Sequence, residues 1–182
     1  MTLEVVTGDL FDPDFGFDAL AQGVNTYGIM GGGIAGEFRE RYPDMRESYQ
    51  QFCQTYRAVA PGMVHYYPGE LGTIFWKDSD PVDPYEGYAV SDEIPVIFNL
   101  FTQVEPGKDQ ARLSLVERSS LQLRLMIEAL SDLTDNPDDG ITSVGLPWIG
   151  CGIGGLDKHN VLHVLESTLG PSDTDFVIVE QP

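Results

Sequence analysis

Residues 19–33 read ALAQGVNTYGIMGGG, and residues 141–155 read ITSVGLPWIGCGIGG. In each stretch an apolar, strand-like run (19–24 or 141–148) leads into a glycine-rich turn (28–33 or 150–155), and a helix-like segment follows. Where a strand feeds a helix through glycines, backbone N–H groups at the helix N-terminus lack partners, and with the helix dipole they attract an anion. Two such turns predict a phosphate-bearing ligand held between them.

Strand and helix patterns alternate along the rest of the chain. Further strands are expected at 3–7, 62–67, 95–101 and 176–179, and helices at 34–42, 43–56, 110–133 and between the cap Asp157 and Gly170. The run 95–101 is almost continuously apolar, which is typical of a strand covered on both faces. This order predicts one domain over residues 1–182, a three-layer α/β/α sandwich around a mixed, mostly parallel sheet.

The charge balance restricts the partners. The chain has 29 acidic and 10 basic residues, a formal net charge of −19, and neither glycine turn contains Lys or Arg. An acidic surface repels nucleic acid and anionic membranes, so neither sequence-specific nucleic-acid binding nor membrane association is expected. Any phosphate must therefore be held by backbone amides. We expect a monomer.

The cellular location is predicted from two features. The chain has no apolar run of membrane-spanning length and no basic leader at its start. Its two cysteines, Cys53 and Cys151, do not suggest a disulfide framework and favour a reducing compartment. A cytoplasmic location is expected.

Both turns match the pattern G-x-G-x-x-G, but their place in the chain argues against two common nucleotide folds. A Rossmann site needs its turn at the first strand of a long βαβ series, and a P-loop needs a GK[ST] triplet that is lacking here. The matching glycines are Gly31, Gly33, Gly36, Gly150, Gly152 and Gly155.

Three separated segments together resemble the macrodomain family. They are residues 8–10 (GDL), 25–35 (NTYGIMGGGIA) and 145–156 (GLPWIGCGIGGL), and their order and spacing agree with the family across almost the entire chain. Three matches in the right strand–turn–helix contexts are far more specific than one glycine pattern. The resemblance implies an ADP-ribose site at the carboxyl ends of the central strands.

The resemblance also implies roles for individual residues. Asp9 would accept a hydrogen bond from the adenine amino group beside the Leu10 backbone N–H, and Asn25 would bind the distal ribose. The diphosphate would lie between the backbones of two groups: Gly31, Gly32, Gly33 and Ile34 in the first turn, and Gly150, Cys151, Gly152, Ile153, Gly154 and Gly155 in the second. The alternatives are a turn cap for Asp9, a strand-end turn residue for Asn25, and tight packing without ligand for the glycines.

The sequence identifies candidate catalytic residues less clearly than candidate binding residues. The family's glycohydrolases carry a lysine where this chain has Gln103, and some members carry an aspartate where it has Gly154. Asn25 and Gln103 are the candidates for orienting substrate and water. Lys108 either reaches the site or is a solvated loop residue.

The leading function is therefore binding of ADP-ribose and hydrolysis of an ADP-ribose derivative, either an ADP-ribosylated macromolecule or ADP-ribose 1''-phosphate. The alternatives are a non-catalytic ADP-ribose reader and a sponge for a related nucleotide signal.

Several other groups have two interpretations each. Cys151 is expected at a helix N-terminus that lowers its pKa, and is either a nucleophile or a small turn residue. His159 and His163 stand four residues apart and are interpreted as surface residues rather than metal ligands. The loop expected at 70–95 has three aromatic residues, Trp76, Tyr85 and Tyr88, which either cover the ligand or pack on the sheet edge. Neither a metal nor a cofactor is expected.

Overall fold

The computed structural model describes residues 3–55, 60–69, 95–133 and 140–182. The elements are, in chain order, β1 (Glu4–Thr7), the 3-10 turn η1 (Pro13–Phe15), β2 (Ala19–Asn25), α1 (Gly33–Arg41), α2 (Pro43–Thr55), β3 (Val64–Tyr67), β4 (Val96–Gln103), α4 (Leu113–Ser131), β5 (Ser143–Leu146), α5 (Lys158–Leu169) and β6 (Asp175–Glu180). The expected alternation of strands and helices is confirmed. Among these residues, no helix is both long and apolar enough to span a bilayer.

The strands form one sheet in the order β1-β6-β5-β2-β4-β3. Every neighbouring pair is parallel except β3 with β4, which is antiparallel. The sheet is thus mixed and mostly parallel, as predicted. The carboxyl ends of β2, β4, β5 and β6 meet at one edge, and the glycine turns follow β2 and β5 there.

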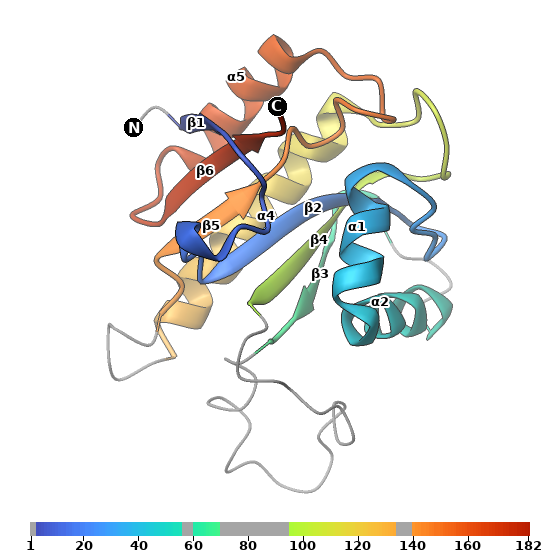
Figure 1. Ribbon diagram of the computed structural model, residues 1–182, viewed down its shortest axis with the longest axis horizontal. Coiled ribbons are helices and arrows are strands. Elements are labelled where there is room, and N and C mark those ends of the chain that lie inside the picture. The colour runs from blue at the N-terminus through green and yellow to red at the C-terminus, as the bar shows by residue number, and fades with distance from the viewer. Residues whose placement is uncertain (1–2, 56–59, 70–94, 134–139) are drawn as a thin grey trace, which may run out of the picture.

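Helices cover both faces of the sheet, with α1 and α2 on one side and α4 and α5 on the other (Figure 1). Alternate residues of the central strands supply the two cores. In β4, Phe98 and Leu100 face the α4 and α5 side, whereas Ile97 and Phe101 face α1 and α2. All four are fully buried, which explains the continuous apolar run of this strand.

The sequence-based expectation was wrong at the second glycine turn. β5 ends at Leu146 rather than at 148, and α5 begins only at Lys158, so the turn does not open the helix directly. The turn curls on itself, since the Leu156 N–H donates to the Gly150 carbonyl at 2.9 Å. The predicted cap is confirmed, because the Asp157 side chain accepts from the Asn160 N–H.

One further expectation differs from the structure, and others concern residues that the structure does not describe. The long helix begins at Leu113 and ends at Ser131, shorter than the 110–133 predicted. Trp76, Tyr85 and Tyr88 lie outside the described residues, as do most of the 70–95 segment and the end of the helix expected at 43–56.

Candidate ADP-ribose site

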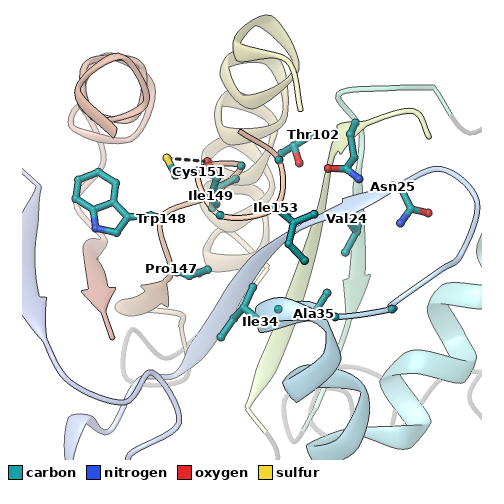
Figure 2. Close-up of a pocket in the computed structure, with 18 of the residues that line it drawn as sticks. Val24, Asn25, Ile34, Ala35, Thr102, Pro147, Trp148, Ile149, Cys151 and Ile153 are labelled. Carbon is teal, nitrogen blue, oxygen red and sulfur yellow. Dashed lines mark hydrogen bonds between the residues drawn. The ribbon is translucent and has the colours of Figure 1, made fainter. Parts of the chain in front are cut away.

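A cavity of about 670 Å³ opens at the carboxyl edge of the sheet, between the two glycine turns. Ligands of open α/β sheets bind at this edge, where successive crossovers diverge to opposite faces. Figure 2 shows Trp148 and Asn25 at opposite ends of the pocket, with Ile153 and Ile34 between them. The predicted residues that line it are Leu10, Asn25, Gly31, Gly32, Gly33, Ile34, Gln103, Gly150, Cys151, Gly152, Ile153 and Gly154.

Asn25 fixes the shape of the first turn. Its Nδ2 donates to the Ile29 carbonyl at 2.6 Å, and its Oδ1 accepts from the N–H groups of Tyr27 and Ile29 at 3.0 and 3.2 Å. The Tyr49 hydroxyl donates to the Asn25 carbonyl, and burial raises the pKa of Tyr49, so it remains a donor. Asn25 is thus a strand-end turn residue, the alternative interpretation, and it also lines the pocket.

The first turn presents unpaired amides to the pocket. α1 begins at Gly33, and its N-cap, Gly32, has no side chain to cap the helix. Within the described part of the chain the first backbone bond of the helix runs from Gly36 to Gly32, so the N–H groups of Gly33, Ile34 and Ala35 have no acceptor. These amides stand at the positive end of the helix dipole and suit a phosphate.

The second turn is held from behind by the loop after β4. The N–H of Asp109 donates to the Ile153 carbonyl at 2.9 Å, and that of Ala111 donates to the Gly154 carbonyl at 3.2 Å. Among the described residues, the N–H groups of Gly152, Ile153 and Gly154 have no acceptor. Ile153 reaches toward the first turn, where a Cβ built on Gly32 would lie 3.8 Å from its Cδ1. The two turns are therefore opposite walls of one pocket.

Gly154 stands where no side chain can be accommodated. A Cβ built there would lie 2.5 Å from the Gly150 carbonyl oxygen and 2.7 Å from Ala111 Cβ, closer than real contacts allow. The glycine at this position is thus required by the backbone. A carboxylate at 154 would need a different turn.

Gln103 ends β4 beside Asn25, with which it is in register. Its Nε2 donates to the Glu105 carbonyl at 3.0 Å, and it lines the pocket together with Thr102. Lys108 is exposed and does not line the pocket, in agreement with a solvated loop lysine.

The opposite end of the pocket contains charged residues that the sequence did not point to. Lys158 forms an ion pair with Glu180, and its Nζ lies 5.3 Å from the centre of the Trp148 ring. The hydrogen bond from Lys158 holds the pKa of Glu180 below its usual value, and the Trp148 side chain lowers it further. The pair joins the start of α5 to the end of β6, so only the sheet order could have revealed it.

Two predicted residues, Asp9 and Gly155, do not line the pocket. Asp9 Oδ1 accepts from the Phe11 N–H at 3.0 Å, and its Oδ2 lies 3.6 Å from the Arg41 guanidinium, which covers the Phe11 ring. These contacts match the turn-cap interpretation of Asp9. A Cβ on Gly155 would collide with Asp109, behind the turn.

The expectation for Cys151 was wrong. Burial raises the pKa of its thiol to about 11, whereas a helix N-terminus was expected to lower it. The physical reason is that α5 begins only at Lys158, so the helix dipole is not directed at the sulfur. His159 and His163 are both exposed on α5, and the described residues contain no group of three His, Cys, Asp or Glu that could hold a metal.

Comparison with known proteins agrees with this geometry. No family model matches the chain. The chain is 28% identical over 169 residues to an ADP-ribose 1''-phosphate phosphatase of Lodderomyces elongisporus, covering 91% of this chain and 92% of that protein. The macrodomain of Thermus aquaticus DarG superposes with a TM-score of 0.70 at 26% identity, covering 99% of this chain and 98% of that one. The chain has the macrodomain fold and resembles these proteins in sequence over almost its whole length.

A second group of relatives is longer than this chain. The chain is 28% identical over 184 residues to the DNA ADP-ribosyl glycohydrolase of Thermus aquaticus, and the match covers 99% of this chain but only 42% of that protein. The macrodomain of Mycobacterium tuberculosis DarG superposes with a TM-score of 0.69 at 27% identity, with 97% of each chain covered. The predicted macrodomain fold is thus confirmed.

Proposed function

We propose that this macrodomain binds ADP-ribose and hydrolyses an ADP-ribose derivative, either an ADP-ribosylated macromolecule or ADP-ribose 1''-phosphate. One observation carries the proposal. Two groups of backbone N–H donors, those of Gly33 to Ala35 and those of Gly152 to Gly154, belong to residues that line one cavity, and none of these donors has an acceptor among the described residues. A diphosphate between the turns gives these donors a partner. Relatives that bear the names of ADP-ribose hydrolases support the choice of ligand.

The two ends of the pocket suit the two ends of ADP-ribose. Buried Leu10 and Val179 line the pocket, and the half-buried Trp148 ring lies at the end away from Asn25 (Figure 2), which favours a flat, largely apolar base there. Asn25 and Gln103 lie at the other end and offer amide groups for ribose hydroxyls. We therefore assign the adenosine to the Trp148 end and the distal ribose to the Asn25 end.

Hydrolysis requires water either at the anomeric carbon of the distal ribose or at a 1''-phosphate bound to it. The amides that anchor the diphosphate would fix this carbon near Asn25 and Gln103, and such positioning supplies much of the rate enhancement of many hydrolases. Gln103 can orient water through its side-chain oxygen, because its Nε2 is already bonded to the Glu105 carbonyl.

A second candidate function, a non-catalytic ADP-ribose reader, is favoured by two observations. Gln103 stands where related glycohydrolases carry a lysine, and the backbone at Gly154 excludes a side chain. Incubation with ADP-ribose 1''-phosphate, ADP-ribosylated protein and ADP-ribosylated DNA separates the two. Release of ADP-ribose from any of them supports the enzyme, and binding without turnover supports the reader.

We also propose that the protein is a cytoplasmic monomer without sequence-specific nucleic-acid binding. A net charge of −19 opposes both self-association and contact with phosphate backbones. Both cysteines, Cys53 and Cys151, are free, which suits a reducing compartment. Light scattering after size exclusion tests the monomer, and a dimer mass would contradict it.

A further inference from the structure

The ladder between β2 and β4 is irregular at one residue, Thr102. Val24 of β2 is paired with Phe101 of β4. The next pair in the register is Asn25 with Gln103, so Thr102 has no partner on β2 and is the extra residue of a β-bulge. Bulges re-aim side chains and are frequent next to active sites. The bulge therefore singles out Thr102 at the end of β4 that borders the pocket.

The Thr102 side chain is buried, yet its hydroxyl has no partner. The residue is 1% exposed and lines the pocket, and no donor or acceptor in the described part of the chain is bonded to Oγ1. Its backbone is fixed, because the Arg112 N–H donates to the Thr102 carbonyl at 3.0 Å. Most buried hydroxyl groups in proteins are paired, so an unpaired one that lines a cavity points to a ligand or a bound water.

Gly23 keeps this hydroxyl accessible from the pocket. It lies within β2 and also lines the pocket. A Cβ built on Gly23 would lie 2.8 Å from Thr102 Oγ1 and 3.2 Å from Ile149 Cγ2, so a side chain there would crowd the hydroxyl. Glycine weakens the interior of a strand and often marks a place where a ligand approaches the backbone closely. Thr102 and Gly23 therefore give two independent signs of a ligand contact.

Thr102 belongs to the end of the pocket to which we assign the distal ribose. It lies between Ile149 and Asn25, whereas Trp148 lies beyond Ile149 (Figure 2). At this end the Asn25 amide already bonds within the first turn through both of its polar atoms. Gln103 Nε2 is bonded to a backbone carbonyl, which leaves its Oε1 as an acceptor. The Thr102 hydroxyl is thus the side-chain donor at this end that is still free among the described residues.

The chemistry of a hydroxyl suits a ribose. A ribose hydroxyl both donates and accepts, as the threonine hydroxyl does, so the two can pair in either direction. The diphosphate needs donors alone, and the amides of the two turns supply them. Gln103 Oε1 can accept one bond from the ribose, and the Thr102 hydroxyl can donate one to it. A donor and an acceptor in neighbouring positions match neighbouring ribose hydroxyls.

We propose that Thr102 is a ligand-binding residue whose hydroxyl forms a hydrogen bond with a hydroxyl group of the distal ribose. The proposal rests on the proposed binding of ADP-ribose and adds a contact outside the three sequence segments that resemble macrodomains. The hydroxyl then gains its partner in the complex and lacks one in the free protein. Its removal should weaken binding without weakening the fold, because an unpaired buried hydroxyl does not stabilise the folded state.

The test compares the wild type with Thr102→Val, Thr102→Ser and Thr168→Val. Valine has the shape of threonine without the hydroxyl, and serine keeps the hydroxyl. Thr168 is a buried threonine of α5 outside the pocket, and its Oγ1 donates to the Val164 carbonyl at 2.9 Å and lies 2.8 Å from Ser120 Oγ. Each protein is titrated in a calorimeter with ADP-ribose and with ADP, which lacks the distal ribose. Urea unfolding of the free proteins measures their stability.

The two threonines should respond in opposite ways. We expect Thr102→Val to weaken ADP-ribose binding about 5–10-fold, the loss of one hydrogen bond, and to leave ADP binding unchanged. Its urea midpoint should equal or exceed that of the wild type. Thr102→Ser should keep most of the affinity for ADP-ribose. Thr168→Val should bind ADP-ribose like the wild type but unfold at a lower urea concentration, because its hydroxyl is paired in the free protein.

The contrary outcomes are separable. Undiminished affinity of Thr102→Val for ADP-ribose would overturn the contact. An equal loss for ADP would also overturn it, because the hydroxyl would then act on the part of the ligand that ADP shares. A lower urea midpoint for Thr102→Val, with a loss of affinity that Thr168→Val reproduces, would assign the effect to the fold. No heat from the wild type at millimolar ADP-ribose would overturn the proposed binding of ADP-ribose itself.

Discussion

Replacing Gly154 with alanine tests whether the second turn requires a glycine at this point. The added Cβ would lie 2.5 Å from the Gly150 carbonyl oxygen and 2.7 Å from Ala111 Cβ. Neither neighbour can retreat freely, because the carbonyl accepts from the Leu156 N–H and the Ala111 N–H donates to the Gly154 carbonyl. Relief therefore requires the turn to move.

The expected cost follows from these contacts. Overpacking at a closed site costs about 1–3 kcal/mol. The hydrogen bond from Ala111 that the movement weakens contributes about 1 kcal/mol. We expect Gly154→Ala to lower the free energy of unfolding by about 3 kcal/mol, summing a mid-range overpacking cost and this bond.

Gly152→Ala is the matched control in the same turn. A Cβ there meets nothing within 4 Å, and Gly152 does not have a positive φ. Its expected effect lies between zero and a gain of about 1 kcal/mol from the reduced entropy of the unfolded chain. Urea unfolding followed by far-UV circular dichroism measures both variants, and a 3 kcal/mol loss moves the midpoint by about 1.5 M at a slope of about 2 kcal/mol/M. Equal midpoints for the two variants would refute the steric argument.

Three further perturbations probe the structure around the site. Burial lowers the pKa of His65 to about 4 from its usual value of about 6.5, so the unfolded chain binds the proton more tightly than the folded protein does. The contribution of His65 to the free energy of unfolding is therefore full above pH 6.5, and about 3 kcal/mol of stability is lost as the pH falls toward 4. His65→Asn should remove this part of the pH dependence of urea unfolding, and an unchanged pH profile would contradict the role given to His65. Asp18 Oδ2 accepts from the N–H and hydroxyl groups of Thr142 and Ser143 at 2.8–3.1 Å, so Asp18→Ala should cost about 2 kcal/mol in thermal or urea unfolding, and a cost near zero would show that these bonds contribute nothing. Asn25→Ala removes the side-chain bonds that shape the first turn and should weaken ADP-ribose binding about 10-fold or more in calorimetry, whereas undiminished affinity would show that the turn keeps its shape without them.

Periodicity and glycine placement predicted most of the fold. Fully buried runs such as Val96–Phe101 and helical spacings such as Val116, Leu123 and Ile127 depend on local sequence, and the structure places them as expected. The path of the second turn was not predictable in this way. The turn is held in place by contacts with Asp109 and Ala111, which are distant in sequence from Gly154.

Electrostatic features of the site were the least predictable from sequence. The pair Lys158–Glu180 depends on α5 starting beside the end of β6. The Cys151 pKa depends on where α5 begins, which the glycine pattern placed too early.

Calorimetric titration with ADP-ribose, on the wild type and on Gly32→Glu, tests the central claim that the two turns hold a diphosphate. Gly32 has an extended backbone, and its Cβ would make only an ordinary contact 3.8 Å from Ile153, so a glutamate fits the fold. A carboxylate about 6 Å from the diphosphate costs about 3 kcal/mol at an effective dielectric constant of 20, or about 100-fold in affinity. Gly32→Ala adds the same Cβ without the charge and is expected to retain most of the affinity. The predicted result is that the wild type binds ADP-ribose, that Gly32→Ala keeps most of the affinity and that Gly32→Glu loses about 100-fold. No heat of binding to the wild type at millimolar ADP-ribose, or equal affinity of the wild type and Gly32→Glu, would contradict the claim.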